Sequence, residues 1–372
     1  MGQRKDLWQH DDCFSLNRLT FAMALSKDKR MKIVIDDKIP YIRETIRQIT
    51  PDAVYIKGAD ISAADVKDAD AMIVRTRTLC NEQLLKGSRV KFIATATIGF
   101  DHIDTHYMES AGIEWTNCPG CNSGSVAQYL RSVLILLCHN KGLNPAEHTV
   151  GVVGYGHVGS KVAAQARTMG FRVLVCDPPL LDAGCTAEEF VDMDRIEREC
   201  KVITFHVPFT KGGKYPTFHL ADEGFFGRLA RSPFVVNTSR GAVVDNAALL
   251  RALQSGCVAD AVVDTWENEP NINLALLNKV YIGTPHIAGY SADGKTNADN
   301  MVISALCRHF GIANRWHIAP PSLPADFRLS GSADDRLLQL YNPLNDSERL
   351  KAAPKEFENL RGNYPLRREK TE

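Results

Sequence analysis

The feature that most constrains the fold is a glycine-rich turn between an apolar run and a helical pattern. Gly154-Tyr-Gly156-His-Val-Gly159 follows the run TVGVV and precedes SKVAAQARTMG. This order is typical of a dinucleotide-binding strand–turn–helix unit. Its first glycine allows the turn, its second lets the backbone approach a pyrophosphate, and its third lets the helix pack on the strand. N–H groups at the helix N-terminus would bind the anion. A purely structural glycine turn is the alternative.

An aspartate follows at the distance that such a unit requires. Asp177 ends the next apolar run, RVLVCD, about 20 residues after the turn. A carboxylate there accepts hydrogen bonds from both ribose hydroxyls and repels a 2′-phosphate. The sequence therefore predicts NAD as the cofactor rather than NADP, the alternative being an aspartate that only faces solvent.

Apolar runs alternate with helical patterns along two stretches of the chain, which predicts parallel sheets covered by helices. The first stretch has strand-like runs at 32–35, 53–56, 71–74, 92–94 and 113–116. The second has them at 150–153, 173–176, 202–205, 234–237, 259–264 and 281–283. We expect an α/β fold with two Rossmann-like, doubly wound parallel-sheet domains and a short C-terminal extension.

The same pattern suggests domain boundaries. Residues 31–124 and a returning helix at 287–311 are expected to form a discontinuous substrate-binding domain, with an NAD-binding domain inserted at 125–286. Residues 1–30 have mixed charge and no period, which predicts a poorly ordered extension. Prolines and charged residues mark 312–372 as a separate C-terminal segment.

Composition argues against several kinds of partner and site. The 44 Lys and Arg residues equal the 44 Asp and Glu residues, whereas nucleic acids and membrane surfaces select for excess positive charge. The ten cysteines lie mostly in apolar runs, as reduced thiols do in a cytoplasmic protein. Cys118 and Cys121 have the spacing of a redox pair but lack its context and lack the further ligands of a metal site. We expect no metal, no nucleic acid and no membrane partner.

Three polar residues follow three successive strands of the second domain. Arg240 follows FVVN, Glu269 follows AVVD, and His286 follows YIGTP. Because ligands bind outside the carboxyl ends of parallel strands, we expect these three side chains to be neighbours. Glu267 competes with Glu269 for its role, and His206, after another strand, is interpreted as a cofactor-side loop residue rather than a second base.

Their chemistry suits the oxidation of a hydroxy acid. A histidine that titrates near neutrality can take the hydroxyl proton while a hydride leaves the same carbon. A carboxylate beside the imidazole fixes its tautomer and stabilises its protonated form. An arginine can bind the substrate carboxylate through two hydrogen bonds. The alternatives are a surface arginine, a solvated glutamate and a core histidine.

At this point the chain resembles the D-isomer-specific 2-hydroxyacid dehydrogenases. The motifs are G-x-G-x-x-G, then N-x-x-R-G, E-x-E-P and P-H. Longer segments narrow the resemblance to the branch that oxidises 4-phospho-D-erythronate in pyridoxal 5′-phosphate (vitamin B6) biosynthesis: KFIATATIGFDHID, TFHVPFTKGGKYPTFHLAD, NTSRGAVVDNAALL and GTPHIAGYS. The resemblance runs from about residue 31 to 310, with a weaker echo in FENLRGNYPLRRE near the C-terminus.

The resemblance implies a role for each matching residue. The residues implied as catalytic are Arg240, Glu269 and His286. Those implied to contact NAD, besides the three glycines of the turn, are Asp177, Val207, Asp264 and Gly289. Those implied to bind substrate are Thr76, Thr97 and Tyr290. Arg75 and Arg77 flank Thr76, and either could meet the 4-phosphate.

The resemblance also has limits. Relatives commonly end in a dimerisation domain, and this chain's counterpart looks shortened, so a homodimer is expected with a reduced interface. Other expectations that stay open are a related dehydrogenase, of the 3-phosphoglycerate or glyoxylate type, and a non-catalytic, nucleotide-sensing dimer. The sequence does not identify the oxidant that recycles NADH.

Overall fold

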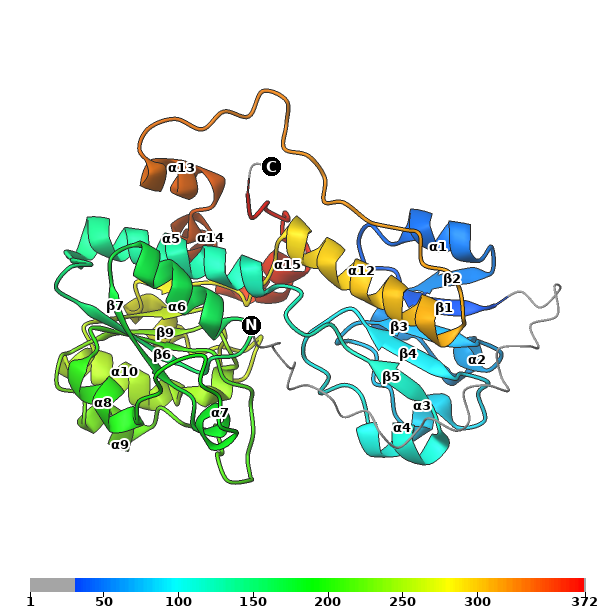
Figure 1. Ribbon diagram of the computed structural model, residues 1–372, viewed down its shortest axis with the longest axis horizontal. Helices are drawn as coiled ribbons and strands as arrows, with labels where there is room; N and C mark the ends of the chain where they lie inside the picture. The colour runs from blue at the N-terminus through cyan, green and yellow to red at the C-terminus, as the bar shows by residue number, and fades with distance from the viewer. Residues whose placement is uncertain (1–30, 371–372) are drawn as a thin grey trace, which may run out of the picture. The chain divides into compact units, whose positions relative to one another are not determined.

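The computed structural model describes residues 31–370, which fall into two compact units (Figure 1). The first unit contains the residues up to Asn117 and returns for Asp299–His317; the second contains Cys118–Ala298 and the residues from Ile318 onward. The N-terminal extension expected at 1–30 lies outside the described residues. Both boundaries expected from the sequence, after 124 and after 286, fall inside the second unit.

The first unit contains a five-stranded parallel sheet in the order β2-β1-β3-β4-β5. Its strands are β1 (Ile33–Asp36), β2 (Ala53–Ile56), β3 (Ala71–Val74), β4 (Phe92–Thr95) and β5 (Glu114–Thr116). Its helices are α1 (Arg43–Ile49), η1 (Gly58–Asp60), α2 (Ala63–Val66), α3 (Glu82–Leu85) and α4 (Thr105–Ala111), joined by the C-terminal part of α12 (Ala292–His309).

Every residue of β1, β3 and β4 is buried. Because successive strand residues point to opposite sides of a sheet, both faces are covered at these three strands. Val34, Met72 and Ile93 pack in one apolar cluster with residues of α2, α3 and α4. On the other face Phe92 stacks on His309 at the end of α12, with ring centroids 4.8 Å apart. The order changes direction between β1 and β3, so loops after these strands lie where open α/β sheets bind ligands.

The second unit contains a six-stranded parallel sheet in the order β11-β10-β9-β8-β6-β7. Its strands are β6 (Thr149–Val153), β7 (Arg172–Cys176), β8 (Val202–Phe205), β9 (Phe234–Asn237), β10 (Asp260–Val263) and β11 (Ile282–Gly283). Its helices up to α12 are α5 (Ser123–Lys141), α6 (Gly159–Thr168), α7 (Pro178–Asp182), α8 (Met193–Glu199), α9 (Glu223–Gly227), η2 (Gly241–Val243), α10 (Asn246–Ser255) and α11 (Leu274–Lys279).

The strand order shows where a dinucleotide would bind. A single parallel bridge joins Val175 of β7 to Phe190, which marks the place of a further edge strand. With that bridge counted as the third strand, the order becomes the doubly wound 3-2-1-4-5-6 with a seventh strand, β11, at its end. Acidic residues surround Phe190 and Val191, so too few apolar residues are present for a longer strand. The switch point lies between β6 and β8.

Two apolar clusters cover the two faces of this sheet. Val150 and Val152 of β6 pack with α5 and α6, whereas Val153 packs with α8 to α11 on the opposite face. Both faces are therefore covered by helices, as the alternation of strands and helices predicts. The α/β class with two parallel-sheet units is confirmed.

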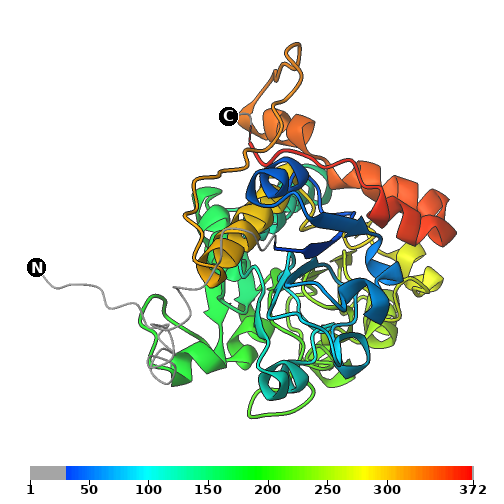
Figure 2. The ribbon, with the colours of Figure 1, turned by 90° about the vertical axis from the view of Figure 1, so that its right-hand side faces the viewer.

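The C-terminal segment belongs to the second unit. Figure 2 follows the chain in orange and red from α12 through a linker into three further helices, which are α13 (Ala333–Leu340), α14 (Pro343–Ala352) and α15 (Phe357–Gly362), with η3 (Pro354–Glu356) before the last. Helix α14 contacts α5 and β11. Leu350 and Phe357 are fully buried in the cluster beneath the sheet, so this segment is part of the unit's core.

Candidate active site

The glycine-rich turn lies at the switch point of the second sheet, and its geometry explains the glycines. Gly154 has φ 92°, and a Cβ there would lie 2.6 Å from the carbonyl oxygen of His206, after β8. A Cβ on Gly159 would lie 1.8 Å from the carbonyl oxygen of Gly154, so only glycine permits this close packing of helix on strand. Beside Gly156, by contrast, nothing lies within 4 Å of a Cβ. That open backbone fits a bound pyrophosphate.

Asp177 follows β7 and is oriented by the turn itself. Its Oδ2 accepts a hydrogen bond from the Tyr155 N–H at 2.7 Å, and its Oδ1 accepts one from the Leu180 N–H at 3.0 Å. A carboxylate oxygen has room for more than one donor, so both oxygens retain lone pairs for ribose hydroxyls. The donor set around the turn therefore fits a dinucleotide.

The loop after β8 forms the other side of the switch point. Nε2 of His206 lies 3.0 Å from Oγ1 of Thr204, and burial lowers the pKa of His206 to about 3. An imidazole with so low a pKa is a poor general base near neutral pH. This favours the interpretation of His206 as a cofactor-side loop residue. Val207 packs against the apolar cluster beneath the sheet.

Glu269 and His286 form a hydrogen-bonded pair after the neighbouring strands β10 and β11. Nδ1 of His286 lies 2.8 Å from Oε2 and 3.1 Å from Oε1 of Glu269. The side chain of His286 is 27% exposed and that of Glu269 is 16% exposed. Because Nδ1 donates to the ionised carboxylate, Nε2 carries the imidazole lone pair and can accept a proton from a ligand.

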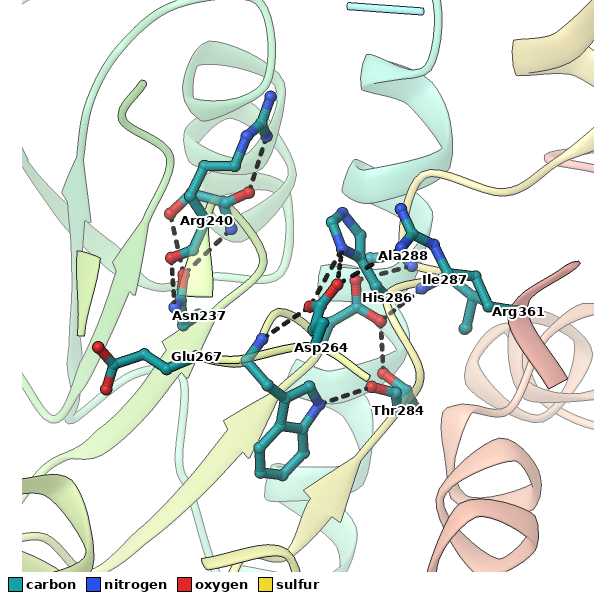
Figure 3. A network of polar contacts seen from close by, with 12 residues as sticks. Asn237, Arg240, Asp264, Glu267, Thr284, His286, Ile287, Ala288 and Arg361 are labelled. Atoms are coloured by element: carbon teal, nitrogen blue, oxygen red, sulfur yellow. Dashed lines mark hydrogen bonds and ion pairs between the residues drawn. The ribbon is translucent and has the colours of Figure 1, made fainter. Parts of the chain in front are cut away.

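Asp264, at the end of β10, holds the loop that carries His286 (Figure 3). Its buried carboxylate accepts hydrogen bonds from the N–H groups of Ile287 and Ala288 at 2.8 and 3.0 Å and from the Thr284 hydroxyl at 2.6 Å. Its own carbonyl accepts from the His286 N–H. These contacts support a backbone with φ 58° at His286, an unusual value for a residue with a side chain.

Two carboxylates near the imidazole have shifted pKa values in opposite directions. Burial raises the pKa of Asp264, and its hydrogen bonds and the charge of His286 offset only part of this. Burial also acts to raise the pKa of Glu269, but the charge of His286, its hydrogen bond and the Trp266 N–H outweigh burial and leave that pKa lowered. Glu269 is therefore ionised near neutral pH, as an acceptor for His286 must be.

Arg240 lies apart from this pair. It follows β9, and its Nη1 donates to the carbonyl oxygen of Ser239 at 2.9 Å. Figure 3 shows its side chain separated from His286, and no contact recorded within residues 31–370 joins its guanidinium to Glu269 or His286. The backbones are nevertheless close, because a Cβ on Gly241 would lie 1.9 Å from the carbonyl oxygen of Trp266. The structure thus brings together two of the three expected groups and places the third on the adjoining loop.

Glu267, the competitor of Glu269, belongs to a different pair. Its Oε1 lies 2.7 Å from Nε2 of His219, and its Oε2 accepts from the Asn246 N–H at 2.9 Å. In Figure 3 its side chain points away from His286. The geometry therefore selects Glu269 as the partner of His286.

Sequence reasoning missed an arginine beside this pair. Nη1 of Arg361, on α15, lies 3.5 Å from Oε2 of Glu269. Only the weak C-terminal echo FENLRGNYPLRRE pointed to this segment, and nothing in its spacing linked it to the strand ends.

The first unit carries the other residues expected to bind substrate. Thr76 is exposed after β3, at the switch point of that sheet. Thr97 follows β4, and its hydroxyl donates to the Gly99 carbonyl at 2.8 Å and lies 2.7 Å from the Thr95 hydroxyl. Arg75 donates from Nη1 to the Lys38 carbonyl, while its buried Nε has no hydrogen-bond partner among the described residues. An unpartnered buried donor at a switch point is where an anion would bind.

Two further features are absent from the part of the chain that the structure describes. No three His, Cys, Asp or Glu side chains gather there as ligands for a metal ion. Within the same residues, every helix is too short or too polar to cross a membrane.

Comparisons with known proteins show the family to which the chain is similar. Residues 136–288 match the family described as D-isomer specific 2-hydroxyacid dehydrogenase, NAD binding domain. The chain is 54% identical to erythronate-4-phosphate dehydrogenase of Bacteroides thetaiotaomicron and 52% identical to that of Bacteroides fragilis, in each case over 91% of this chain and 97% of the relative. A crystal structure of D-lactate dehydrogenase from Aquifex aeolicus with NAD and lactic acid has a TM-score of 0.63 at 26% identity, covering 75% of this chain and 96% of that one.

Proposed function

The chain belongs to the erythronate-4-phosphate dehydrogenases, within the D-isomer-specific 2-hydroxyacid dehydrogenases, and we propose that it oxidises 4-phospho-D-erythronate to 2-oxo-3-hydroxy-4-phosphobutanoate with NAD. The observation that carries this proposal is the hydrogen-bonded pair of His286 and Glu269 at the same sheet edge as the glycine-rich turn. The reaction would serve pyridoxal 5′-phosphate biosynthesis, as the name of the relatives implies.

His286 is the proposed base. Its Nε2 takes the proton of the C2 hydroxyl as the C2–H hydride leaves, and the imidazolium that forms is stabilised by the Glu269 carboxylate at Nδ1. In the reverse direction the same nitrogen returns the proton. Bound NAD supplies the hydride acceptor. Arg240 is proposed to bind the C1 carboxylate and polarise the C2 oxygen through the N–H donors that do not bond to the Ser239 carbonyl.

The residues proposed to hold NAD share the carboxyl edge of the second sheet. The backbone at Gly154, Gly156 and Gly159 would take the pyrophosphate, and Asp177 the adenosine ribose. The remaining contacts proposed are Val207, Asp264 and Gly289. A Cβ on Gly289 would lie 2.2 Å from Nδ2 of Asn122, so a larger residue there would displace that side chain. Among the described residues Oδ2 of Asp264 accepts from Ala288 alone, so it retains capacity for a cofactor donor.

The residues proposed to bind substrate are hydroxyl-bearing or basic. Thr76, Thr97 and Tyr290 would form hydrogen bonds with the phosphorylated acid, for which the Thr97 hydroxyl would have to turn from the Gly99 carbonyl. The unpartnered Nε of Arg75 makes that side chain the proposed ligand of the 4-phosphate, with Arg77 as the alternative. A homodimer and a cytoplasmic location are further proposals, which light scattering and cell fractionation would test.

The decisive experiment follows NADH formation with 4-phospho-D-erythronate beside D-3-phosphoglycerate, glycolate and D-lactate. We expect 4-phospho-D-erythronate to give the highest kcat/KM. A preference for D-3-phosphoglycerate or for glycolate would indicate a different dehydrogenase of the same family. Binding of NAD without turnover of any hydroxy acid would indicate a nucleotide sensor.

A further inference from the structure

The end of the chain is built into the loop that carries His286. Arg367 forms an isolated parallel bridge with Ser291, and its carbonyl accepts the Ala292 N–H at 2.8 Å. Its buried guanidinium donates to the carbonyl oxygens of three residues that follow His286, which are Ile287 at 3.1 Å, Ala288 at 2.6 Å and Tyr290 at 2.8 Å. The C-terminal segment therefore fixes the backbone of this loop through Arg367.

Arg361 precedes Arg367 on the same segment, and its side chain contacts Glu269 of the candidate catalytic pair. Its side chain is 23% exposed and lies 3.5 Å from the Glu269 carboxylate. Glu269 is thus shared between two groups, with His286 at 2.8 Å and Arg361 on the same oxygen, Oε2. A guanidinium is permanently charged, so this position always carries one positive charge.

We propose that Arg361 is a positioning residue of the active site, which keeps the Glu269 carboxylate ionised and oriented and whose charge opposes protonation of His286. The proposal rests on the proposed function, since it assigns Arg361 an effect on the base of that reaction. The C-terminal segment then contributes to the chemistry as well as to the fold.

The charges around His286 predict in which direction its protonation shifts when Arg361 is replaced. The charged groups around the imidazole are Glu269 and Asp264, which follow β10, and Arg361 on α15, which contacts the Glu269 carboxylate. With neutral His286, the negative charge of Glu269 is matched by Arg361. Without Arg361, Glu269 would attract the proton on His286 more strongly, and the base would be protonated at a higher pH.

A purely structural role would not need a charge at this position. Arg367 already holds the loop backbone, and Arg361 contacts the Glu269 side chain rather than loop carbonyls. Burying most of a guanidinium also costs desolvation, which a neutral side chain would avoid. The charge is therefore the property to test.

The test compares R361Q, R361M and R361K with R336Q, in which an exposed arginine of α13 on the same segment is replaced. The pH profile of kcat/KM is measured with NAD saturating, and the His286 imidazole is titrated by NMR in the protein without substrate. We expect the acid limb and the NMR midpoint to move up by about 0.5–1 pH unit in R361Q. R361K and R336Q should stay within about 0.2 of the unaltered chain.

If R361Q fails to fold, R361M, which keeps an unbranched apolar side chain, replaces it. The same upward shift of the acid limb and the NMR midpoint is expected. A limb and midpoint that do not move in the neutral variants overturn the proposal, whether kcat/KM is unchanged or lowered at every pH. The two failures are distinguishable. An enzyme with no activity on any hydroxy acid would refute the proposed function, while the NMR midpoint would still decide the role of Arg361.

Discussion

The described residues of the second unit include two histidine–glutamate pairs of similar distance, one formed through Nδ1 of His286 and the other through Nε2 of His219. His286 and Glu269 meet at 2.8 Å, His219 and Glu267 at 2.7 Å, and both histidines have positive φ, at 58° and 49°. The histidine side chains are similarly exposed, at 27% and 29%. A short distance between an imidazole and a carboxylate therefore does not identify a catalytic pair.

The two pairs differ in where they lie and in what holds them. His286 and Glu269 directly follow neighbouring strands, and Asp264, Arg361 and Arg367 surround them with fixed charge. His219 instead lies in the long loop before α9, stacks on Phe218 with ring centroids 4.0 Å apart, and fastens that loop to the start of α10 through Glu267. We infer from this comparison that support from the sheet edge distinguishes the pair proposed to be catalytic from the pair proposed to be structural.

The largest difference is expected when each histidine is removed. His286→Asn deletes the base and should lower kcat roughly 10²- to 10⁴-fold, with NAD affinity unchanged. His219→Asn should leave kcat within about threefold, because its imidazole fastens a loop. Steady-state kinetics and NAD titration check both. Equal losses in the two variants would refute the distinction.

Replacing the two glutamates should distinguish a role in supporting the base His286 from a role in holding the loop of His219. Glu269→Gln keeps the size but loses the charge that stabilises protonated His286, so we expect kcat to fall by about 10²-fold. Glu267→Gln should leave kcat intact while the free energy of unfolding falls by about 1 kcal/mol, since one charged acceptor of the loop is lost. Kinetics and denaturant unfolding measure the two effects. A kcat loss in Glu267→Gln alone would reverse the assignment.

The aspartates beside the two pairs offer a matched substitution. Asp264→Asn weakens a buried acceptor of three donors, so the free energy of unfolding should fall by about 2–3 kcal/mol, with a loss of kcat. Asp245, 3.9 Å from His219, caps α10 through the N–H groups of Ala247 and Ala248. Asn caps helices equally well, so Asp245→Asn should change stability by less than about 0.5 kcal/mol. Similar unfolding midpoints for the two variants would contradict this account.

The smallest effect is a pH dependence of stability at Glu269. Burial acts to raise its pKa, but its contacts with His286 and Trp266 leave the folded pKa below the ordinary value of 4.5. Such a carboxylate contributes stability that is complete above pH 4.5 and is lost as pH falls through the folded pKa. The difference in unfolding free energy between the unaltered chain and Glu269→Gln should therefore narrow below pH 4.5. Urea unfolding at several pH values tests this, and a difference that widens in acid would contradict it.

Much of this molecule follows from local sequence. The alternation of apolar runs predicts the strands of both sheets, because buried parallel strands are short and continuously apolar. The glycine turn predicts the switch point, because only glycine fits at Gly154 and Gly159. That a glutamate from the loop after β10 lies beside His286 could be predicted, because parallel strands end at one edge, but Glu267 and Glu269 stayed competitors for that role.

What the sequence left open depends on side-chain direction and on long-range packing. No pattern shows that Arg240 turns back to Ser239 or that Glu267 finds His219 across a loop. Arg361 lies 92 positions from Glu269, on a short helix outside the strand series. Its position is set by the burial of Phe357 in the core, which a periodic pattern cannot report.

The most direct test of the central claim is the fate of the C2 hydrogen of 4-phospho-D-erythronate. With the substrate deuterated at C2, we expect the unaltered chain to transfer deuterium to the nicotinamide, His219→Asn to do so at a similar rate, and His286→Asn to do so at a rate lower by orders of magnitude. Release of the deuterium to solvent, or undiminished transfer in His286→Asn, would contradict the account.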